Sequence, residues 1–373
     1  MLTDGQVRQL AKFDGHGAPV LSLYLDLDPA RQVRHSYRIA LEDLVNGARE
    51  SLDKRTREAL TNEVSRLEEW LDGHEPAGRG LVAFSCATQG LQETHELPVH
   101  VEDHLSFEPR PDVGPLLELI DENERYAVAL VDKQRARLFT VFLGEIEESD
   151  EIFDYVPPKT DQGGLSQSHF QRHHELHVLW HLKHVAQHLT ELFRRRSFDR
   201  LIIAGHEEAM SELKTLLPRA LARRVAAEIP ADTQASEHDI LEKSLEVERG
   251  IEQEGEEHLL DYLLEVAGSG GRAIVGRQST LEALYLDEVR TLVASAGLAI
   301  PGSDCPNCRW LEPGTPPNAA CSKCGTAVRP VHDLVHAVMT RAVELGGTVE
   351  SVHGDAARRL EERGGLGALL RFR

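Results

Sequence analysis

The stretch KTDQGGLSQSHFQRHHELHVLWHLKHVAQHL, residues 159–189, joins a diglycine loop directly to a long amphipathic helix. Gly163 and Gly164 can adopt positive φ and allow another molecule to approach the backbone closely, because they lack a Cβ. Gln167 offers an amide that both donates and accepts hydrogen bonds. The alternative interpretation is an ordinary strand-to-helix turn with Ser166 as the N-cap. Both interpretations predict a helix that begins near residue 166.

Two stripes of side chains follow this predicted helix. The apolar stripe, which we expect to pack on a core, comprises Val178, Leu182, Val185, Leu189 and Leu192. The adjacent stripe, spaced by three or four residues, comprises His169, His173, His177, His181, His184 and His188. We expect these histidines to flank the core as a half-solvated face, and imidazoles there could also bind phosphates when protonated or sense pH. A metal site is less favoured, since no carboxylate or cysteine obviously completes it.

Strands and helices alternate along the rest of the chain, which predicts an α/β fold with mixed sheets flanked by helices. We expect an N-terminal α/β domain over residues 1–121, a middle domain over 122–235 and a C-terminal α/β domain over 236–373. The proline-bearing stretch 107–115 is interpreted as a linker. Predicted strands are 20–25, 80–85, 126–132, 137–143, 200–204 and 225–229, and predicted helices are 36–52, 54–71 and 236–267.

The order of these segments resembles that of a known family. Residues 125–148 (RYAVALVDKQRARLFTVFLGEIEE) precede the diglycine loop, and residues 198–218 (FDRLIIAGHEEAMSELKTLLP) follow the long helix with an Ala204-Gly205 turn. Residues 364–373 (GGLGALLRFR) resemble the family's closing segment, and residues 19–29 (PVLSLYLDLDP) match its first strand. The family is that of the archaeal and eukaryotic class-one peptide chain release factors, and the chain resembles a bacterial relative in the release factor/Pelota superfamily. This implies a three-domain release-factor-like architecture.

The resemblance implies a ribosome-binding translation factor that hydrolyses peptidyl-tRNA, with Gly163, Gly164 and Gln167 as catalytic residues. Ribosomal RNA would contact Arg172, His173, His177, His181 and Lys183, and a translational GTPase is a further candidate partner. The family's tripeptide is contiguous, whereas here the glutamine is displaced by two positions, and residues 31–52 show no stop-codon-reading loop. We therefore expect ribosome rescue without stop-codon reading. The alternatives are a non-hydrolytic A-site-binding rescue or dormancy factor, as Pelota is, and an acidic protein-interaction scaffold.

The pairs Cys305/Cys308 and Cys321/Cys324 form two C-x-x-C motifs with twelve residues between them. Four thiolates at this spacing can surround one Zn²⁺ tetrahedrally and leave no position for water, which predicts a structural zinc site. Two redox dithiols are the competing interpretation. The site would lie in a zinc-ribbon insert, residues 303–328, of the C-terminal domain. Cys86 alternates with apolar neighbours and is expected to be a buried thiol without a role.

The charge and the apolar content of the chain indicate which classes of partner it can bind. The net charge of -21 opposes a nucleic-acid partner, but residues 168–200 contain six Lys or Arg against three acids, a local charge of +3. Residues 237–265 contain eleven acids and two bases, a local charge of -9. Such asymmetry fits one RNA-facing surface, or simply two surface helices of opposite sign. We expect a cytoplasmic protein without a membrane partner, because no apolar run approaches the length of a span.

Overall fold

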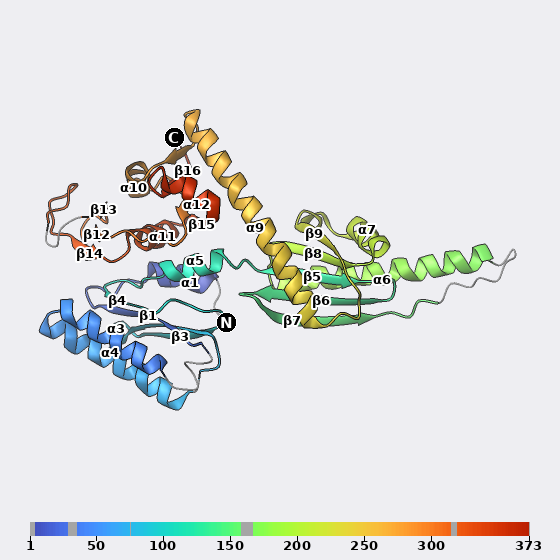
Figure 1. Cartoon of the computed structure of the whole chain (residues 1–373), viewed down its shortest axis with the longest axis horizontal. Coiled ribbons are helices and arrows are strands. Elements are labelled where there is room, and N and C mark those ends of the chain that lie inside the picture. The colour runs from blue at the N-terminus through green and yellow to red at the C-terminus, as the bar shows by residue number, and fades with distance from the viewer. Residues whose placement is uncertain (1–3, 29–35, 75, 158–166, 315–318, 373) are drawn as a thin grey trace. The chain divides into compact units, whose positions relative to one another are not determined.

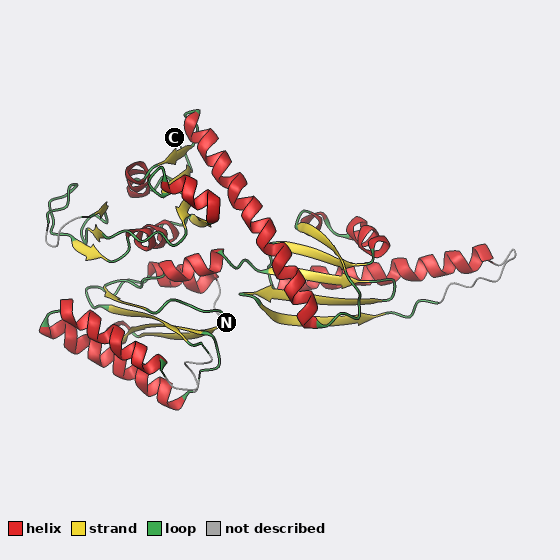
Figure 2. Cartoon of the chain, viewed as in Figure 1, coloured by secondary structure: helices red, strands yellow, loops and turns green. Residues whose placement is uncertain are grey.

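Buried strands and amphipathic helices form a mixed α/β structure, as the sequence predicted (Figures 1 and 2). The computed structural model describes residues 4–28, 36–74, 76–157, 167–314 and 319–372. Among them, none of the helices combines the length and apolarity that a membrane span requires.

The helices are α1 Asp4–Lys12, α3 Tyr37–Ser51, α4 Lys54–Gly73, α5 Gly114–Asp121, α6 Gln167–Arg195, α7 Glu207–Leu216, α8 Arg219–Ala222, α9 Glu237–Gly268, α10 Arg277–Tyr285, α11 Leu334–Glu344 and α12 Gly354–Glu361. The strands are β1 Val20–Asp26, β2 Gly80–Cys86, β3 Leu91–Leu97, β4 His104–Glu108, β5 Tyr126–Val131, β6 Arg135–Phe142, β7 Glu145–Phe153, β8 Arg200–Gly205, β9 Val225–Pro230, β10 Ala273–Val275, β11 Val289–Ser295, β12 Gly302–Asp304, β13 Leu311–Pro313, β14 Arg329–Val331, β15 Thr348–Val352 and β16 Leu366–Leu370.

The chain divides into two compact units, one comprising Met1–Glu122 with Glu254–Arg373 and the other comprising Asn123–Gln253. Helix α9 begins in the second unit and ends in the first. The three predicted domains stay a prediction.

The second unit is built on a five-stranded sheet in the order β7-β6-β5-β8-β9, in which β5, β8 and β9 are parallel. Both faces of β5 are buried, which explains the continuous apolar run YAVALV. Ala127 and Ala129 pack with α6 and α7, whereas Val128 and Leu130 pack with Ile240 of α9. Helices therefore cover both faces of the sheet (Figure 1).

Gly205 explains the Ala-Gly turn that ends β8. Its φ is +135°, and a Cβ at this position would lie 2.0 Å from the carbonyl oxygen of Val131 in β5. No L-residue with a side chain fits there without moving the neighbouring strand. The turn between β5 and β6 is closed by Asp132, whose Oδ1 accepts hydrogen bonds from the amides of Gln134 and Arg135. Asp132 therefore caps this turn with its side chain.

In the first unit, an antiparallel sheet of order β3-β2-β1-β4 buries Leu21, Leu23 and Leu25 against α3 and α4. Cys86 is buried in β2, as predicted. The interpretation of residues 107–115 as a linker was wrong at both ends, because β4 extends to Glu108 and α5 begins at Gly114. A proline near the start of a helix lacks only an amide that would be unpaired anyway, so Pro115 fits the first turn of α5 rather than marking a loop.

The first unit contains a second sheet, of order β10-β16-β11-β15. Helices α10 and α11 pack with one set of its side chains, and α12 with the last turns of α9 packs with the other. A small antiparallel sheet, β13-β12-β14, belongs to the same buried cluster as α11. Its strands flank the two C-x-x-C motifs.

Candidate functional site

Most of the diglycine loop lies outside the residues that the structure describes. Gly163, Gly164 and Ser166 are not among the described residues. Gln167 is the first residue of α6, so its backbone is already helical. The expected start of the helix near residue 166 is thereby confirmed. Figure 1 shows the first turns of α6 extending beyond the sheet of the second unit.

The apolar stripe of α6 faces the core, as predicted. Leu182, Val185 and Leu189 are fully buried against the sheet, and Val178 and Leu192 join the same cluster. A 29-residue helix is far more stable in this setting than alone, because packing supplies most helical stability in proteins. The helix therefore presents a fixed set of side chains on its remaining faces.

His181 departs from the expectation that the histidine stripe flanks the core. Its side chain has no exposed surface, and its Nδ1 lies 2.8 Å from Oδ2 of Asp154. His174, which lies off the stripe, is also buried, and its Nδ1 lies 2.7 Å from the carbonyl oxygen of Pro157. The segment that follows β7 covers this side of α6 and supplies both partners. Helical spacing alone does not reveal such a cover.

Asp154 connects several histidines. The same Oδ2 lies 3.0 Å from Nδ1 of His184, and Nε2 of His184 lies 3.1 Å from Nε2 of His188. Partial burial would raise the pKa of the Asp154 carboxyl, but the hydrogen bonds from His181 and His184 outweigh it and lower that pKa. Asp154 is therefore ionised at neutral pH and acts only as an acceptor.

A second group of rings lies on the exposed side of α6. The ring centroids of His173 and His177 are 4.6 Å apart, and those of His177 and Trp180 are 5.2 Å apart. Trp180 is 59% exposed, which is unusual for so large an apolar side chain. Arg172 and Lys183 are exposed on the same helix. These residues form an aromatic and basic surface, which we call the α6 surface.

Much of the positive charge near the end of α6 is neutralised within the chain. Arg195 pairs with Glu148 and Asp150 of β7, at 2.8 and 3.0 Å. Arg200 is bound by Glu124 and by Glu248 and Glu252 of α9. Opposite charges at these distances cancel each other's field at longer range. The local charge of +3 therefore overstates the charge that is available to a partner.

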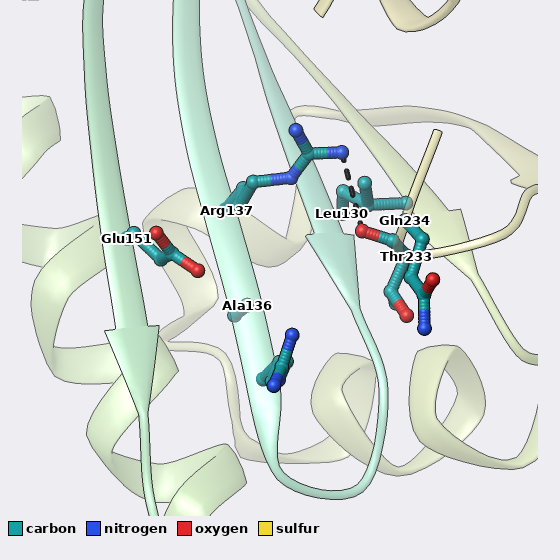
Figure 3. Close-up of a pocket in the computed structure, with 7 residues that line it drawn as sticks. Leu130, Ala136, Arg137, Glu151, Thr233 and Gln234 are labelled. Atoms are coloured by element: carbon teal, nitrogen blue, oxygen red, sulfur yellow. Dashed lines mark hydrogen bonds between the residues drawn. The ribbon is translucent and has the colours of Figure 1, made fainter. Parts of the chain in front are cut away.

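A cavity of about 360 Å³ lies on the face of the sheet covered by α9 (Figure 3). Arg137 of β6 reaches toward the segment before α9 and donates to the carbonyl oxygen of Thr233 at 3.2 Å, while Glu151 lies on the neighbouring strand. Arg135 and Gln234 complete its polar lining. The cavity holds charges of both signs, and the hydroxyl of its lining residue Thr233 donates to Oδ2 of Asp132 at 3.0 Å.

The four cysteines of the two C-x-x-C motifs converge. Their sulfur atoms all lie within 4.8 Å of one another, with Cys305 to Cys324 at 3.4 Å and Cys308 to Cys321 at 3.6 Å. None of them forms a disulfide. Sulfurs that share one Zn²⁺ tetrahedrally at about 2.3 Å lie about 3.8 Å apart, close to these separations. The cluster can therefore hold a metal ion.

Each motif is closed by backbone hydrogen bonds. The amide of Arg309 donates to the carbonyl oxygen of Cys305, and that of Gly325 donates to Cys321, both at 2.9 Å. Arg309 and Gly325 both have positive φ, which turns each loop back around its cysteines. Hydrogen bonding with Thr326 lowers the pKa of the Cys324 thiol to about 5. Burial raises the pKa of the Cys308 thiol to about 12, so the thiols of the cluster differ in how readily they ionise.

Residues 111–249 match the family model described as Bacterial archaeo-eukaryotic release factor family 10. The chain is a relative within the release factor/Pelota superfamily. Peptide chain release factor subunit 1 of Pyrococcus abyssi is 22% identical over 404 residues, covering 99% of this chain and 97% of that protein. The same subunit of Thermoplasma acidophilum is 26% identical over 393 residues, covering 98% and 94%.

Solved structures from this superfamily align along much of the chain. An archaeal translation termination factor, aRF1, is 18% identical, covers 99% of this chain and 96% of its own, and has a TM-score of 0.27. Archaeoglobus fulgidus Pelota is 17% identical, covers 79% of each chain, and has a TM-score of 0.33. The assignment to the superfamily rests on the sequence matches rather than on these low scores.

Sequence reasoning missed Asp154 as a partner of α6. The residue lies in the acidic run EIEESDEIFD, residues 145–154, where the alternation of an edge strand is hidden by exposed acids on both faces. Ile146 and Ile152 share parity within that run but pack on opposite faces of the sheet, because the register of β6 and β7 shifts between Thr140 and Val141. Strand parity therefore gives no signal for the position of Asp154.

Proposed function

We propose that the chain is a ribosome-binding translation factor that acts in ribosome rescue without reading stop codons. The observation that carries this proposal is the match to archaeal peptide chain release factor subunits along 98–99% of the chain in one unbroken order. The family model over residues 111–249 supports it independently, and it covers most of the second unit, including α6.

The α6 surface is the proposed RNA contact. Trp180 offers an exposed aromatic ring on which a nucleotide base can stack, a contact worth about 1–3 kcal/mol. Lys183 and Arg172 can contact phosphates, and His173 and His177 can donate hydrogen bonds to them. His181, initially expected in this set, is excluded because it is buried against Asp154.

Peptidyl-tRNA hydrolysis is the proposed reaction of the loop. Backbone amides near Gly163 and Gly164 would stabilise the oxyanion that forms when water attacks the ester, and the amide of Gln167 would orient that water. Losing one donor to an oxyanion typically costs about 2.7–4 kcal/mol. No titrating side chain is required for this chemistry.

One observation favours the non-hydrolytic alternative, in which the protein occupies the A site without cleaving the ester. Gln167 lies in the first turn of α6 rather than next to the diglycine. A rescue factor of this kind would need the α6 surface but not Gln167.

For the cysteine cluster, we propose structural Zn²⁺. Its four sulfur donors lie within 4.8 Å of one another and suit Zn²⁺, which structural sites hold tetrahedrally without a water ligand. Because Cys305 and Cys321 are buried in the cluster that contains α11, metal binding would stabilise more than the small sheet itself.

Ribosome cosedimentation tests the proposed binding. Full-length protein is pelleted with ribosomes over a range of salt concentrations, together with Lys183→Glu and the control Lys243→Glu in acidic α9. The Lys183→Glu protein should bind more weakly at every salt concentration, with a salt slope lower by about one, because one phosphate contact is lost. Absence of retention of the wild type at low salt, or equal effects of the two substitutions, would contradict the proposal.

Hydrolysis is tested with peptidyl-tRNA on loaded ribosomes. Wild type, Gln167→Ala and the control Gln171→Ala, one turn further along α6, are compared for peptide release. Release that only Gln167→Ala abolishes supports the reaction. Ribosome binding without release in any of the three supports the non-hydrolytic alternative.

A further inference from the structure

We propose that His184 and His188 form an exchangeable site for a divalent transition-metal ion of the Zn²⁺ type, with Asp154 as the residue that positions His184. The site is separate from the four cysteines, because it lies on α6 in the second unit and they lie in the first. It does not depend on the proposed ribosome binding.

The protonation of His184 follows from its contacts. Oδ2 of Asp154 lies 2.8 Å from Nδ1 of His181 and 3.0 Å from Nδ1 of His184. An ionised carboxylate has no hydrogen to donate, so both Nδ1 atoms must carry the proton. In neutral His184, the lone pair therefore resides on Nε2. Metal-ligating histidines almost always donate their other ring N–H in this manner, which fixes the ring and raises its basicity.

The lone pair of His184 is directed at a second imidazole. Nε2 of His188 lies 3.1 Å from Nε2 of His184. Two nitrogens that share one ion at about 2.0–2.1 Å, with an angle of about 90° to 109° at the metal, lie about 2.9–3.4 Å apart. The observed separation falls within this range. The four-residue spacing on α6 holds both rings on one face without any rearrangement of the backbone.

The remaining coordination positions would be filled by water or by an incoming ligand. Within the described residues, no third His, Cys, Asp or Glu brings a ligand atom into a cluster with these two nitrogens. His184 is 45% exposed, so an ion bound there would meet solvent. A two-histidine set of this kind holds the ion less tightly than the four thiolates would, and imidazole ligands suit Zn²⁺, Ni²⁺ and Cu²⁺.

The same helix provides an internal control. His173 and His177 are also four residues apart, with ring centroids at 4.6 Å, close to the 4.7 Å of His184 and His188. In the described structure, neither ring of this pair has a carboxylate partner comparable with Asp154. If four-residue spacing alone made a site, both pairs would bind metal equally. If the carboxylate matters, the His184/His188 pair should bind much more tightly.

Untagged full-length protein, first saturated with one equivalent of Zn²⁺, is titrated with further Zn²⁺ by calorimetry at pH 7.5. The wild type should bind one more equivalent, which His184→Ala and His188→Ala should each remove and His173→Ala should retain. Absence of the extra equivalent, its retention in His188→Ala, or its equal loss in His173→Ala would overturn the proposal.

Asp154→Asn tests the positioning role. Replacing such an outer partner typically weakens metal binding about 10- to 100-fold, whereas a residue that only stabilises the fold would leave the affinity unchanged in the folded protein. Circular dichroism establishes that the variant is folded before titration. Co²⁺ absorption gives a second readout, since imidazole ligands lack the intense thiolate charge-transfer bands of a cysteine site. Wild-type affinity in Asp154→Asn would remove Asp154 from the site.

Discussion

Replacing Gly205 with alanine should destabilise the sheet of the second unit in a way that separates steric contact from backbone strain. The new Cβ would lie 2.0 Å from the carbonyl oxygen of Val131 and 3.1 Å from its amide nitrogen. Both atoms belong to β5, which pairs with β8 along its whole length. Neither can move without disturbing the parallel ladder, so relaxation is expensive.

The matched control is Gly144→Ala at the turn between β6 and β7. Gly144 also has positive φ, +71°, but a Cβ there would meet no atom within 4 Å. Each substitution should cost about 1–2 kcal/mol for placing a side chain in left-handed backbone. Only Gly205→Ala should add the cost of overpacking, about 1–3 kcal/mol. The two variants should therefore differ by about 1–3 kcal/mol.

Hydrogen exchange measured by mass spectrometry on peptides from β5 and β8 reports local opening of this sheet. A difference of about 1–3 kcal/mol corresponds to about 5- to 150-fold faster exchange in Gly205→Ala than in Gly144→Ala. Peptides from the first sheet of the other unit serve as an unaffected reference. Equal exchange in the two variants would refute the argument that contact with Val131 requires glycine at the Ala-Gly turn.

Three further predictions follow from the ion pairs and the cysteines. Hydrogen bonds with Glu122 and Glu256 raise the pKa of His353 to about 10, above an unfolded value of about 6.5, so its contribution to stability is complete below about pH 6.5 and lost as pH rises through 10. The stability difference between wild type and His353→Gln, measured by urea unfolding, should therefore shrink from pH 6 to pH 10.5, and a constant difference would contradict this role. Cys321→Ala should lose one equivalent of bound zinc by elemental analysis, whereas Cys86→Ala should retain it, because Cys86 lies in β2 outside the cluster. Arg200→Ala should destabilise the second unit by about 3–5 kcal/mol, because it leaves buried Glu248 without its partner, whereas Arg194→Ala on exposed α6 should change stability by less than about 0.5 kcal/mol in thermal or urea unfolding.

Strands that are buried on both faces were predictable from the sequence. Exposed edge strands, and side chains that a distant segment covers, were not predictable. The run YAVALV predicted β5 because parallel strands under two layers of helix are apolar throughout. The acidic edge strand β7 was not among the predicted strands, because its exposed side chains obscure the alternation. The predicted linker wrongly included the first two residues of α5, Gly114 and Pro115, because proline also occurs in the first turn of helices.

In the candidate sites too, short-range spacing was predictable from the sequence, and contacts with distant segments were not. Two C-x-x-C motifs imply convergence of their sulfurs, since a short spacing limits where each pair can lie, and the four cysteines do converge. The burial of His181 depends instead on Asp154, which lies 27 residues earlier in the chain. Helical spacing places His181, His184 and His188 on one face, but it contains no information about which segment covers that face.

The small sheet β13-β12-β14 contributes to the apolar core around α11, so the protein does not tolerate its deletion. Leu311, Val328 and Val331 share one apolar interior with Leu334 and Val338 of α11, and a Cβ on Gly302 would already press on Leu334 at 3.0 Å. A shortened chain that lacks residues 302–331 would expose the apolar face of α11 to water. We expect such a chain to aggregate unless other apolar residues cover that face.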